Sequence, residues 1–435
     1  MALDGADLAL GWGTVPAGGC TGGVTRPRAL LLSVLLAAAC GAPATAPLAA
    51  PSSPAAGVAV GERLVVEGDV STEVIETATG RTAASLPSGR LAPSKDLIVH
   101  LGANGGNTAV AAVDLVGKPL FGLTLSGEYV LPSAYGAAPS GFSPNGRWLV
   151  LVSRDATESR FAIVDVAKGA VAATITLSSR FSFDAIHNDG SAMYLIEHPK
   201  PGATSYNVRL YKLASRTLLP DIIFDKASIG QYDPTVGLMD GTFHVSVAPT
   251  QGDWSFGLYM RPNGSPFVHA LNVPGQYATC IVDLAGTWTP SSMFSMALSP
   301  DGRWLYVVDS AGGTISVIDA FTQKVSRTAT FATRGAGDAH AASAVVSRDG
   351  TRLYASGARG VAVIQTADLS LKGWAAPDLV VRSLAISSDG ARLFGLGAGG
   401  VQVIDAASGR VLSRLTSETS ARAIHLLFRD TVSRQ

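Results

Sequence analysis

The sequence contains little charge. Of its 435 residues only 15% are Asp, Glu, Lys or Arg, against roughly 25% in typical soluble domains. The 33 acidic residues balance the 33 basic ones, so the chain lacks the excess of positive charge that marks nucleic-acid binding. No apolar run approaches the roughly 20 residues that a membrane-spanning helix needs, which excludes a polytopic membrane protein. The hydrophobic content of 47% is too high for a disordered chain.

Cysteine is nearly absent as well. The three cysteines are Cys20, Cys40 and Cys280, and the first two lie in the N-terminal segment. A mature chain would therefore keep one free thiol, Cys280, and no intrachain disulfide. A domain of this size can be held together by its hydrophobic core alone.

Sequence patterns that carry catalysis or bind metal are also missing. There is no H-E-x-x-H, H-x-x-E-H or C-x-x-C spacing and no G-x-S-x-G serine elbow. The seven histidines stand mostly in apolar strand contexts such as Phe267-Val-His-Ala270, which indicates core or edge histidines. Paired glycines that begin at Gly105, Gly312 and Gly399 precede no helical pattern, so we interpret them as turns and not as phosphate-binding loops. We therefore predict no catalytic residue, no cofactor and no metal, which favours a non-enzymatic protein.

The N-terminal segment has the pattern of an export signal. Arg26 and Arg28 form a basic start, an apolar core runs from Ala29 to Ala39, and small residues precede Cys40. This arrangement resembles the bacterial lipobox, in which the cysteine becomes the lipidated first residue of the mature chain. An ordinary signal peptide, cut near residue 44 or 50, is the alternative.

The chain is expected to divide into three parts. Residues 1–40 form the leader with its signal, residues 41–61 an Ala/Pro/Ser-rich tether that buries nothing, and residues 62–435 the folded domain. Because residues 1–25 match no part of a signal peptide, we expect translation to start nearer Val24.

One motif recurs along the folded domain. Each copy combines an apolar strand, an Asn-Gly or Asp-Gly turn and a second strand, and copies are spaced by roughly 40 to 60 residues, as the blades of a β-propeller are. Because Asn-Gly and Asp-Gly adopt positive φ readily, we expect tight primed turns there. The clear copies are Ser143-Pro-Asn-Gly-Arg-Trp-Leu149, Ser299-Pro-Asp-Gly-Arg-Trp-Leu305, Ser347-Arg-Asp-Gly-Thr-Arg-Leu353 and Ser387-Ser-Asp-Gly-Ala-Arg-Leu393. The weaker copies are Pro93-Ser-Lys-Asp96, His187-Asn-Asp-Gly190 and Met239-Asp-Gly241.

The motif resembles the YVTN-type, WD40-like propeller repeat of bacterial lipoproteins, in which S-P-D-G-x-x-L-Y-V precedes a strand end of the form I-D-T-x-T-G. Matching strand ends here are Ile163-Val-Asp165, Val317-Ile-Asp319 and Val403-Ile-Asp405. The resemblance covers residues 62–428 and implies an all-β propeller of seven or eight four-stranded blades. Counting turns gives eight blades, whereas irregular stretches near residues 190 and 241 favour seven. The repeat specifies turns and core packing and contains no reacting group.

The two ends of the folded domain are expected to meet. The segment from Ala423 to Phe428 has the pattern of an innermost strand, and the segment from Leu64 to Leu86 that of strands two to four. If both ends share one blade, they close the ring and leave no open edge between blades.

The candidate binding residues lie in loops that lead from the outer strand of one blade to the inner strand of the next. In propellers such loops converge on one mouth of the central channel. Here they carry acids, bases and aromatics, a mixture suited to a small polar ligand or a peptide end, although loops are also polar simply because they face water. A metal on Asp233, Asp338 and His340 is conceivable, but nothing in the sequence brings the three together. The predicted binding residues are Tyr135, Arg180, Asp184, Asp233, Trp288, Asp338, His340, Arg382 and Arg422.

Together these observations predict an exported propeller on the outer face of the cytoplasmic membrane or in the periplasm, anchored by lipid on Cys40, with secretion as the alternative. We expect a monomeric, non-enzymatic binding or scaffold module for an envelope protein, a peptide or a glycan, with no nucleic-acid partner. A second hypothesis is an exported enzyme or enzyme subunit, since similar repeats occur in the heavy chain of quinoprotein amine dehydrogenases and in propeller lactonases. The sequence does not specify the ligand.

Overall fold

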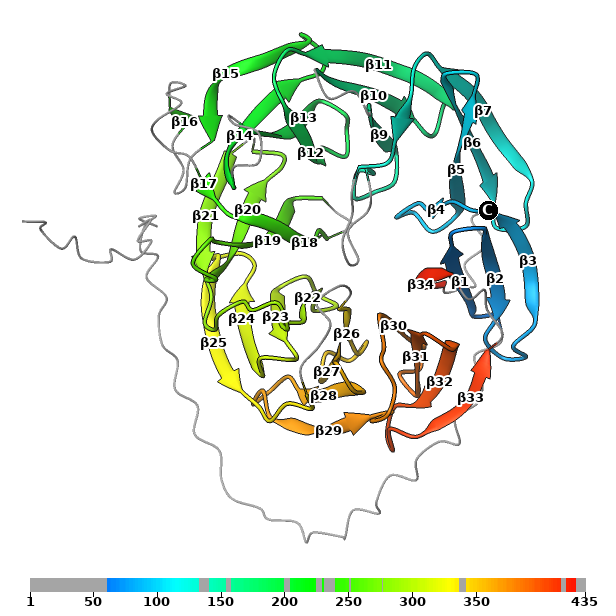
Figure 1. Ribbon diagram of the computed structural model, residues 1–435, viewed down its shortest axis with the longest axis vertical. Helices are drawn as coiled ribbons and strands as arrows, with labels where there is room; N and C mark the ends of the chain where they lie inside the picture. Colours follow the sequence, from blue (N-terminus) through cyan, green and yellow to red (C-terminus); the bar gives the residue numbers. More distant parts are fainter. Residues whose placement is uncertain are drawn as a thin grey trace, which may run out of the picture. The chain divides into compact units, whose positions relative to one another are not determined.

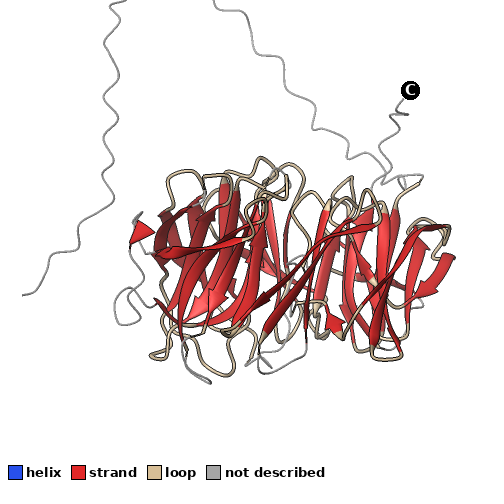
Figure 2. Ribbon diagram, turned by 90° about the horizontal axis from the view of Figure 1, so that it is seen from above, coloured by secondary structure: helices blue, strands red, loops and turns tan. Residues whose placement is uncertain are grey.

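The computed structural model contains strands and turns, and no helix, in the residues that it describes (Figure 2). Within these residues there is accordingly no helical segment with the length and apolarity needed to cross a bilayer. The predicted leader with Cys40, residues 41–60 of the predicted tether, and Tyr135, Asp233, Asp338 and His340 lie outside them. The described residues are 61–132, 141–153, 158–198, 204–223, 229–230, 239–249, 252–275, 277–335, 342–415 and 420–427.

The strands form eight antiparallel sheets that stand as blades around a ring (Figure 1). The fold is thus an eight-bladed β-propeller, and eight is the number given by the count of turns. In blades 1 to 7 the strands follow one another in chain order from the centre of the ring to its rim. Blades 1 and 2 consist of β4 (Arg90–Leu91), β5 (Leu97–Asn104), β6 (Asn107–Asp114) and β7 (Pro119–Leu125), and of β8 (Tyr129–Val130), β9 (Trp148–Ser153), β10 (Ser159–Asp165) and β11 (Ala170–Leu177).

Blade 3 is the one sheet with more than four strands among those described. Two short strands extend its outer part, one of which follows β15 while the other pairs with β14. Its strands are β12 (Phe181–Ile186), β13 (Ala192–Glu197), β14 (Ser205–Lys212), β15 (Thr217–Ile223), β16 (Ile229–Gly230) and β17 (Met239–Asp240). Blade 4 consists of β18 (Thr242–Val247), β19 (Trp254–Met260), β20 (Pro266–Asn272) and β21 (Tyr277–Asp283).

Blades 5 to 7 are the regular copies of the repeat. Each has four strands in chain order, and each inner strand contacts the inner strand of the next blade. They consist of β22 (Phe294–Leu298), β23 (Trp304–Asp309), β24 (Thr314–Asp319) and β25 (Lys324–Thr330); of β26 (Ala344–Val346), β27 (Arg352–Ser356), β28 (Val361–Gln365) and β29 (Leu371–Ala375); and of β30 (Ser383–Ile386), β31 (Arg392–Gly397), β32 (Gly400–Asp405) and β33 (Val411–Leu415).

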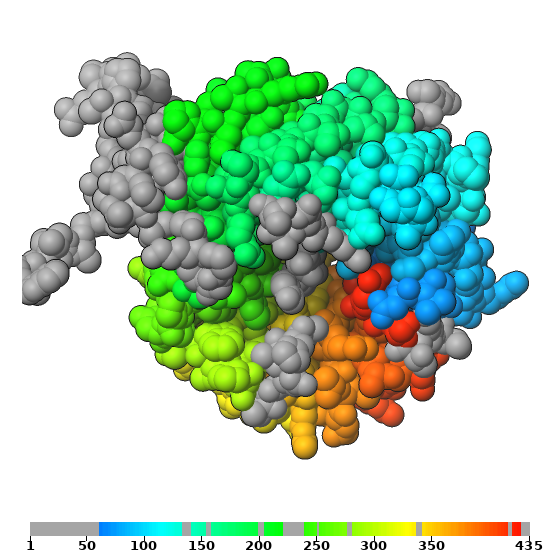
Figure 3. Space-filling model, turned by 45° about the horizontal axis from the view of Figure 1, so that its top comes forward, coloured from blue at the N-terminus to red at the C-terminus, as the bar shows by residue number. Residues whose placement is uncertain are grey.

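Blade 8 joins the two ends of the domain, as predicted. Its inner strand is β34 (Ala421–Leu427) from the C-terminal end, followed outward by β1 (Arg63–Gly68), β2 (Ser71–Glu76) and β3 (Thr82–Pro87). In Figure 3 the last described residues, coloured red, lie beside the blue start of the domain. The ring is therefore closed by hydrogen bonds between segments more than 300 residues apart in sequence.

The turn between the inner and second strands, here called the inner turn, has the same internal bonds in each clear copy of the motif. In blade 5, Gly302 N donates to Ser299 O at 2.8 Å, and the Ser299 hydroxyl donates to the Asp301 carboxylate at 2.5 Å. Only the glycine has positive φ, at 71°, and the aspartate does not. The expectation of primed turns is therefore wrong, because a primed turn needs positive φ at its central residues. The turn is of type I, and the glycine follows it in the left-handed conformation.

Two of the weaker copies are inner turns, and one is not. In blade 3, Gly190 N donates to His187 O at 2.9 Å, while in blade 1 Lys95 occupies the glycine position with φ of 61°. Met239-Asp-Gly241 does not form an inner turn, because its first two residues form β17 and pair with β14. The inner turn of blade 4 ends instead at Gly252, whose N–H donates to Pro249 O at 2.8 Å.

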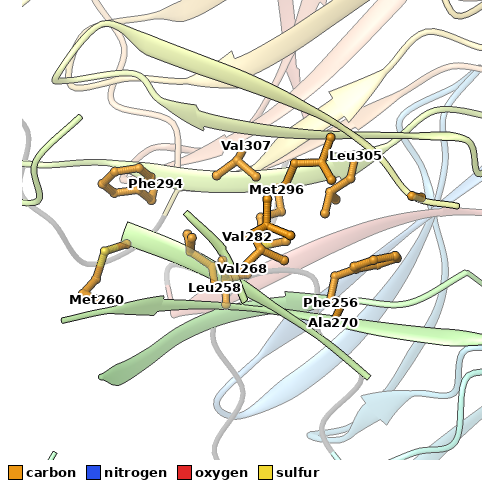
Figure 4. Packing of buried hydrophobic residues seen from close by; sticks show 13 residues of the cluster. Phe256, Leu258, Met260, Val268, Ala270, Val282, Phe294, Met296, Leu305 and Val307 are labelled. Atoms are coloured by element: carbon orange, nitrogen blue, oxygen red, sulfur yellow. The ribbon is translucent and has the colours of Figure 1, made fainter. Parts of the chain in front are cut away.

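The core consists of separate apolar clusters between blades. The described residues contain eight such clusters, one for each pair of neighbouring blades, including the pair formed by blades 8 and 1. Figure 4 shows the cluster between blades 4 and 5, where Phe256 and Val268 pack toward Met296 and Val307. Each blade thus buries both faces, which explains the high apolar and low charged content of the sequence.

The rim of the ring carries the outer strands. In every blade the pairing of the third strand with the fourth shifts register, and in all blades except blade 3 the shift lies near the start of the fourth strand. Such bulges increase twist and discourage pairing of an open edge with another chain.

Candidate functional site

Two kinds of connection meet at one edge of the ring. Crossover loops lead from the outer strand of one blade to the inner strand of the next, and middle turns join the second and third strands of a blade. Since neighbouring strands are antiparallel, both fall on the edge opposite the inner turns. We call this the crossover edge. Arg180, Trp288 and Arg382 lie in crossover loops, and Arg422 lies at the start of β34, where the last crossover loop ends.

Two of these residues are held by contacts within the propeller. The Arg422 guanidinium donates to Gly68 O at 3.0 Å and pairs with the Asp69 carboxylate at 3.1 Å, so it links β34 to the middle turn of blade 8. The Trp288 side chain is half-buried against the blade 4–5 cluster, and the Trp288 backbone N–H donates to Gly264 O at 2.7 Å. Both residues are therefore fixed in place at the crossover edge.

The other two loop residues are exposed. Arg180 lies beside His198, whose backbone N–H donates to Arg180 O at 2.9 Å. Burial, and then the charge of Arg180, lower the pKa of the His198 imidazole. Arg382 is exposed, while its backbone N–H donates to Leu396 O at 2.7 Å. Among the described residues, no hydrogen bond or ion pair joins any two of the predicted binding side chains.

Asp184 differs from the rest because it lies on an inner strand and not in a loop. In the pairing of β12 with β13, Phe183 faces Leu195 and Ala185 faces Tyr194, so Asp184 is the extra residue of a β-bulge. Bulges often redirect a side chain next to a functional site. The carboxyl is only partly exposed, and burial raises its pKa to about 7.

The side chains near Asp184 come from the interface between blades 3 and 4. Tyr206 and Tyr259 stack with ring centroids 5.1 Å apart, and the negative charge of Asp184 would raise the pKa of both phenols beyond the effect of burial. His269 packs edge-on to Tyr259 at 6.1 Å and is 2% exposed, and burial lowers its pKa to about 4. The Tyr206 hydroxyl and the His269 Nε2 are buried and form no regular hydrogen bond with the protein. At neutral pH the His269 imidazole is therefore neutral, and the Asp184 carboxyl lies close to its pKa.

Sequence reasoning found Asp184 but not the cluster around it. Tyr206, Tyr259 and His269 belong to three strands of two blades, and their shared position depends on how the blades pack. The expectation of core histidines is confirmed for His269. Blades 3 and 4 depart from the regular repeat and are rich in aromatic residues. This is the one sequence signal that could have indicated the cluster.

Metal-binding geometry does not occur in the described part of the chain. No group of three or more His, Cys, Asp or Glu side chains converges there. Asp233, Asp338 and His340, the three residues of the metal hypothesis, lie outside the described residues. The glycine pairs at residues 105, 312 and 399 lie in or beside the middle turns of blades 1, 5 and 7, which confirms their interpretation as turns.

Comparison with known proteins identifies the fold. No family model matches the sequence, and a search of curated proteins finds no match. Among solved structures, the dihydro-heme d1 dehydrogenase NirN in complex with DHE is 15% identical, with a TM-score of 0.54 over 84% of this chain and 74% of that one. Apo AztD from Citrobacter koseri is 13% identical with a TM-score of 0.43, covering 84% and 98% of the two chains. A eukaryotic initiation factor is 12% identical with a TM-score of 0.47, also covering 84% and 98%. At 15% identity the likeness to the first of these concerns the fold alone. Together with the eight sheets of the ring, it identifies the chain as a β-propeller.

Proposed function

We propose that the protein is an exported, lipid-anchored propeller of the YVTN type that binds an envelope protein, a peptide or a glycan at its crossover edge. The observation that carries this proposal is the presentation of Arg180, Trp288 and Arg382 from separate blades at that edge, on loops tied to rigid sheets. Function in scaffolds of this kind resides in loops that a rigid framework positions. Residues 26–40 support export and lipidation, because two arginines are followed by an apolar run and then by Cys40.

The binding proposal is tested by quantitative pull-down from envelope extract. The full chain is compared with an Arg180→Ala/Trp288→Ala variant and with a control variant, Phe321→Ala/Arg348→Ala. Both control residues are exposed at the opposite edge: Phe321 in the third-to-outer turn of blade 5 and Arg348 in the inner turn of blade 6. We expect the first variant to lose at least tenfold of the captured partner and the control to retain it. Equal capture by both variants would remove the crossover edge as the binding surface.

Anchoring requires a separate experiment. Cells that express the full chain are labelled with a radioactive fatty acid, and the label is followed with and without Cys40→Ser. We expect label on the wild-type chain and none on the variant. Incorporation that persists without the cysteine would refute the lipid anchor.

An exported enzyme or enzyme subunit is the second candidate, favoured by Asp184. A carboxyl with a pKa raised to about 7 has the value of a general acid or base near neutral pH, and perturbed groups concentrate at functional sites. The same shift also follows from simple burial at a blade interface. If a reaction is found, Asp184→Asn should abolish its pH dependence near 7 while the binding seen in the pull-down persists.

A further inference from the structure

The crossover loop between blades 6 and 7, residues 376–382, is fixed to both blades by its backbone. Gly360 N, in the middle turn of blade 6, donates to Leu379 O at 2.6 Å, and Arg382 N donates to Leu396 O of blade 7 at 2.7 Å. A Cβ on Gly397 would lie 2.5 Å from Val380 O, so the loop rests directly on the middle turn of blade 7. This loop therefore has little freedom to rearrange.

Three arginines lie on this loop or at the two middle turns that flank it. Arg359 belongs to the middle turn of blade 6, Arg382 ends the loop, and the guanidinium of Arg414 lies beside Gly399 in the middle turn of blade 7. All three are exposed, and within the described residues none of their guanidinium groups has an ion pair or a hydrogen bond. Some other arginines are paired with acids of the propeller, as Arg90 is with Glu67 and Arg209 with Glu197. What distinguishes the three arginines at this loop is their common position at the crossover edge, between two neighbouring blades.

The same loop also exposes one acid and one large apolar residue. Asp378 is exposed, and Val380 is 57% exposed although it is a large apolar side chain. We define Arg359, Asp378, Val380, Arg382 and Arg414 as the arginine surface. In a chain with as many acids as bases overall, it is a local excess of positive charge.

We propose that the arginine surface binds an acidic peptide segment that also carries apolar side chains. A guanidinium forms two parallel hydrogen bonds with a carboxylate, which gives both charge and geometry to the recognition. Val380 offers apolar contact that a phosphate chain or a nucleic acid would not use, and Asp378 repels a uniformly anionic polymer. Because the loop backbone is already fixed, less conformational entropy is lost on binding. This inference rests on the proposed function and names the chemistry of its partner.

Fluorescence anisotropy with defined probes tests the inference on the full chain. The probes are a labelled peptide of about ten residues that alternates Glu and Leu, the same peptide with Lys in place of Glu, and inorganic polyphosphate as a competitor. The test variant is Arg359→Gln/Arg382→Gln/Arg414→Gln. The matched control, Arg81→Gln/Arg216→Gln/Arg348→Gln, removes the same charge from exposed inner and third-to-outer turns. Far-ultraviolet circular dichroism checks that both variants fold.

We expect the Glu–Leu peptide to bind the wild type and the control equally, and to bind the test variant at least tenfold more weakly. The Lys–Leu peptide should not bind, and salt should weaken the Glu–Leu complex because the surface is exposed. Equal loss in both variants, or equal binding of both peptides, would overturn the inference. So would polyphosphate that binds more tightly than the Glu–Leu peptide, because the site would then be one for polyanions. If the envelope partner is lost with Arg180→Ala/Trp288→Ala but kept by the test variant, the proposed function stands and this inference fails.

Discussion

At the scale of single residues, the glycines of the inner turns differ in what surrounds them. Gly302 has φ of 71° and open space around the position of a Cβ, whereas a Cβ on Gly190, with φ of 75°, would press into the buried Trp148 ring. We expect Gly302→Ala to lower the free energy of unfolding by about 1 kcal/mol, from backbone strain alone. Gly190→Ala should cost about 1 to 3 kcal/mol more because the indole must move. Urea denaturation of both variants measures the difference, and equal midpoints would contradict this explanation.

Glu67 is a buried charge at the junction of blades 8 and 1. Its carboxylate pairs with Arg90 at 2.6 Å and accepts a hydrogen bond from Leu91 N at 2.7 Å. Burial alone would raise its pKa, but the charges of His425 and Arg90 and these hydrogen bonds lower it to about 2. Because the folded pKa lies below the unfolded value, the stabilisation is complete above pH 4.5 and is lost as the pH falls toward 2.

The corresponding variant is Glu67→Gln. It should lower the free energy of unfolding by about 3 kcal/mol at neutral pH and remove most of the loss of stability between pH 4.5 and 2. The measurement is the urea midpoint as a function of pH. A variant whose acid sensitivity equals that of the wild type would show that other groups control it.

Asp184 and His269 should give stability slopes of opposite sign. The native state keeps Asp184 protonated between about pH 3.8 and 7, so the free energy of unfolding falls as the pH rises through that range. The native state keeps His269 neutral between about pH 4 and 6.5, so its contribution rises with pH. Asp184→Asn should therefore leave a rising slope between pH 4.5 and 6.5, and His269→Gln a falling one. Equal slopes in the two variants, measured by urea denaturation, would contradict the assignment.

At the scale of strands and turns, the sequence predicts the repeated elements well and the irregular ones poorly. The motif around Ser299 and Gly302 places the inner turn correctly because its bonds are local. Met239-Asp-Gly241 also contains Asp-Gly, but its first two residues form β17 because they pair with β14, which is a tertiary contact. The bulge at Asp184 also has no local signature, because it arises from the register of β12 against β13.

The closing strand is the element whose loss should matter most. A chain that ends at Leu415 lacks β34, and Leu64, Val66 and Ile75 then lose the apolar neighbours Ile424 and Leu426. We expect such a chain to show no cooperative urea transition, whereas a chain that ends at Leu427 should unfold like the full chain. A cooperative transition with an unchanged slope in the shorter chain would show that β34 is dispensable.

At the scale of the whole molecule, composition and repeat spacing predict a propeller. The number of blades and the contacts between side chains of different blades depend on packing. The number of blades stays ambiguous in the sequence because blades 3 and 4 lack the clear motif, whereas eight clusters and eight sheets complete the ring in the structure. Arg180, Trp288 and Arg382 could be assigned to one edge because alternating strand direction fixes where each connection falls. The tyrosines near Asp184 could not, because two blades must pack before Tyr206 and Tyr259 meet.

The central claim is that a partner contacts the crossover edge, and site-specific photo-cross-linking in intact cells tests it most directly. A photoreactive residue is placed at Val380, on the crossover loop of blades 6 and 7, or at Phe321, an even more exposed apolar position in the third-to-outer turn of blade 5. We expect a cross-linked partner from position 380 and none from position 321. Cross-linking at position 321 alone, or equally at both positions, would contradict it.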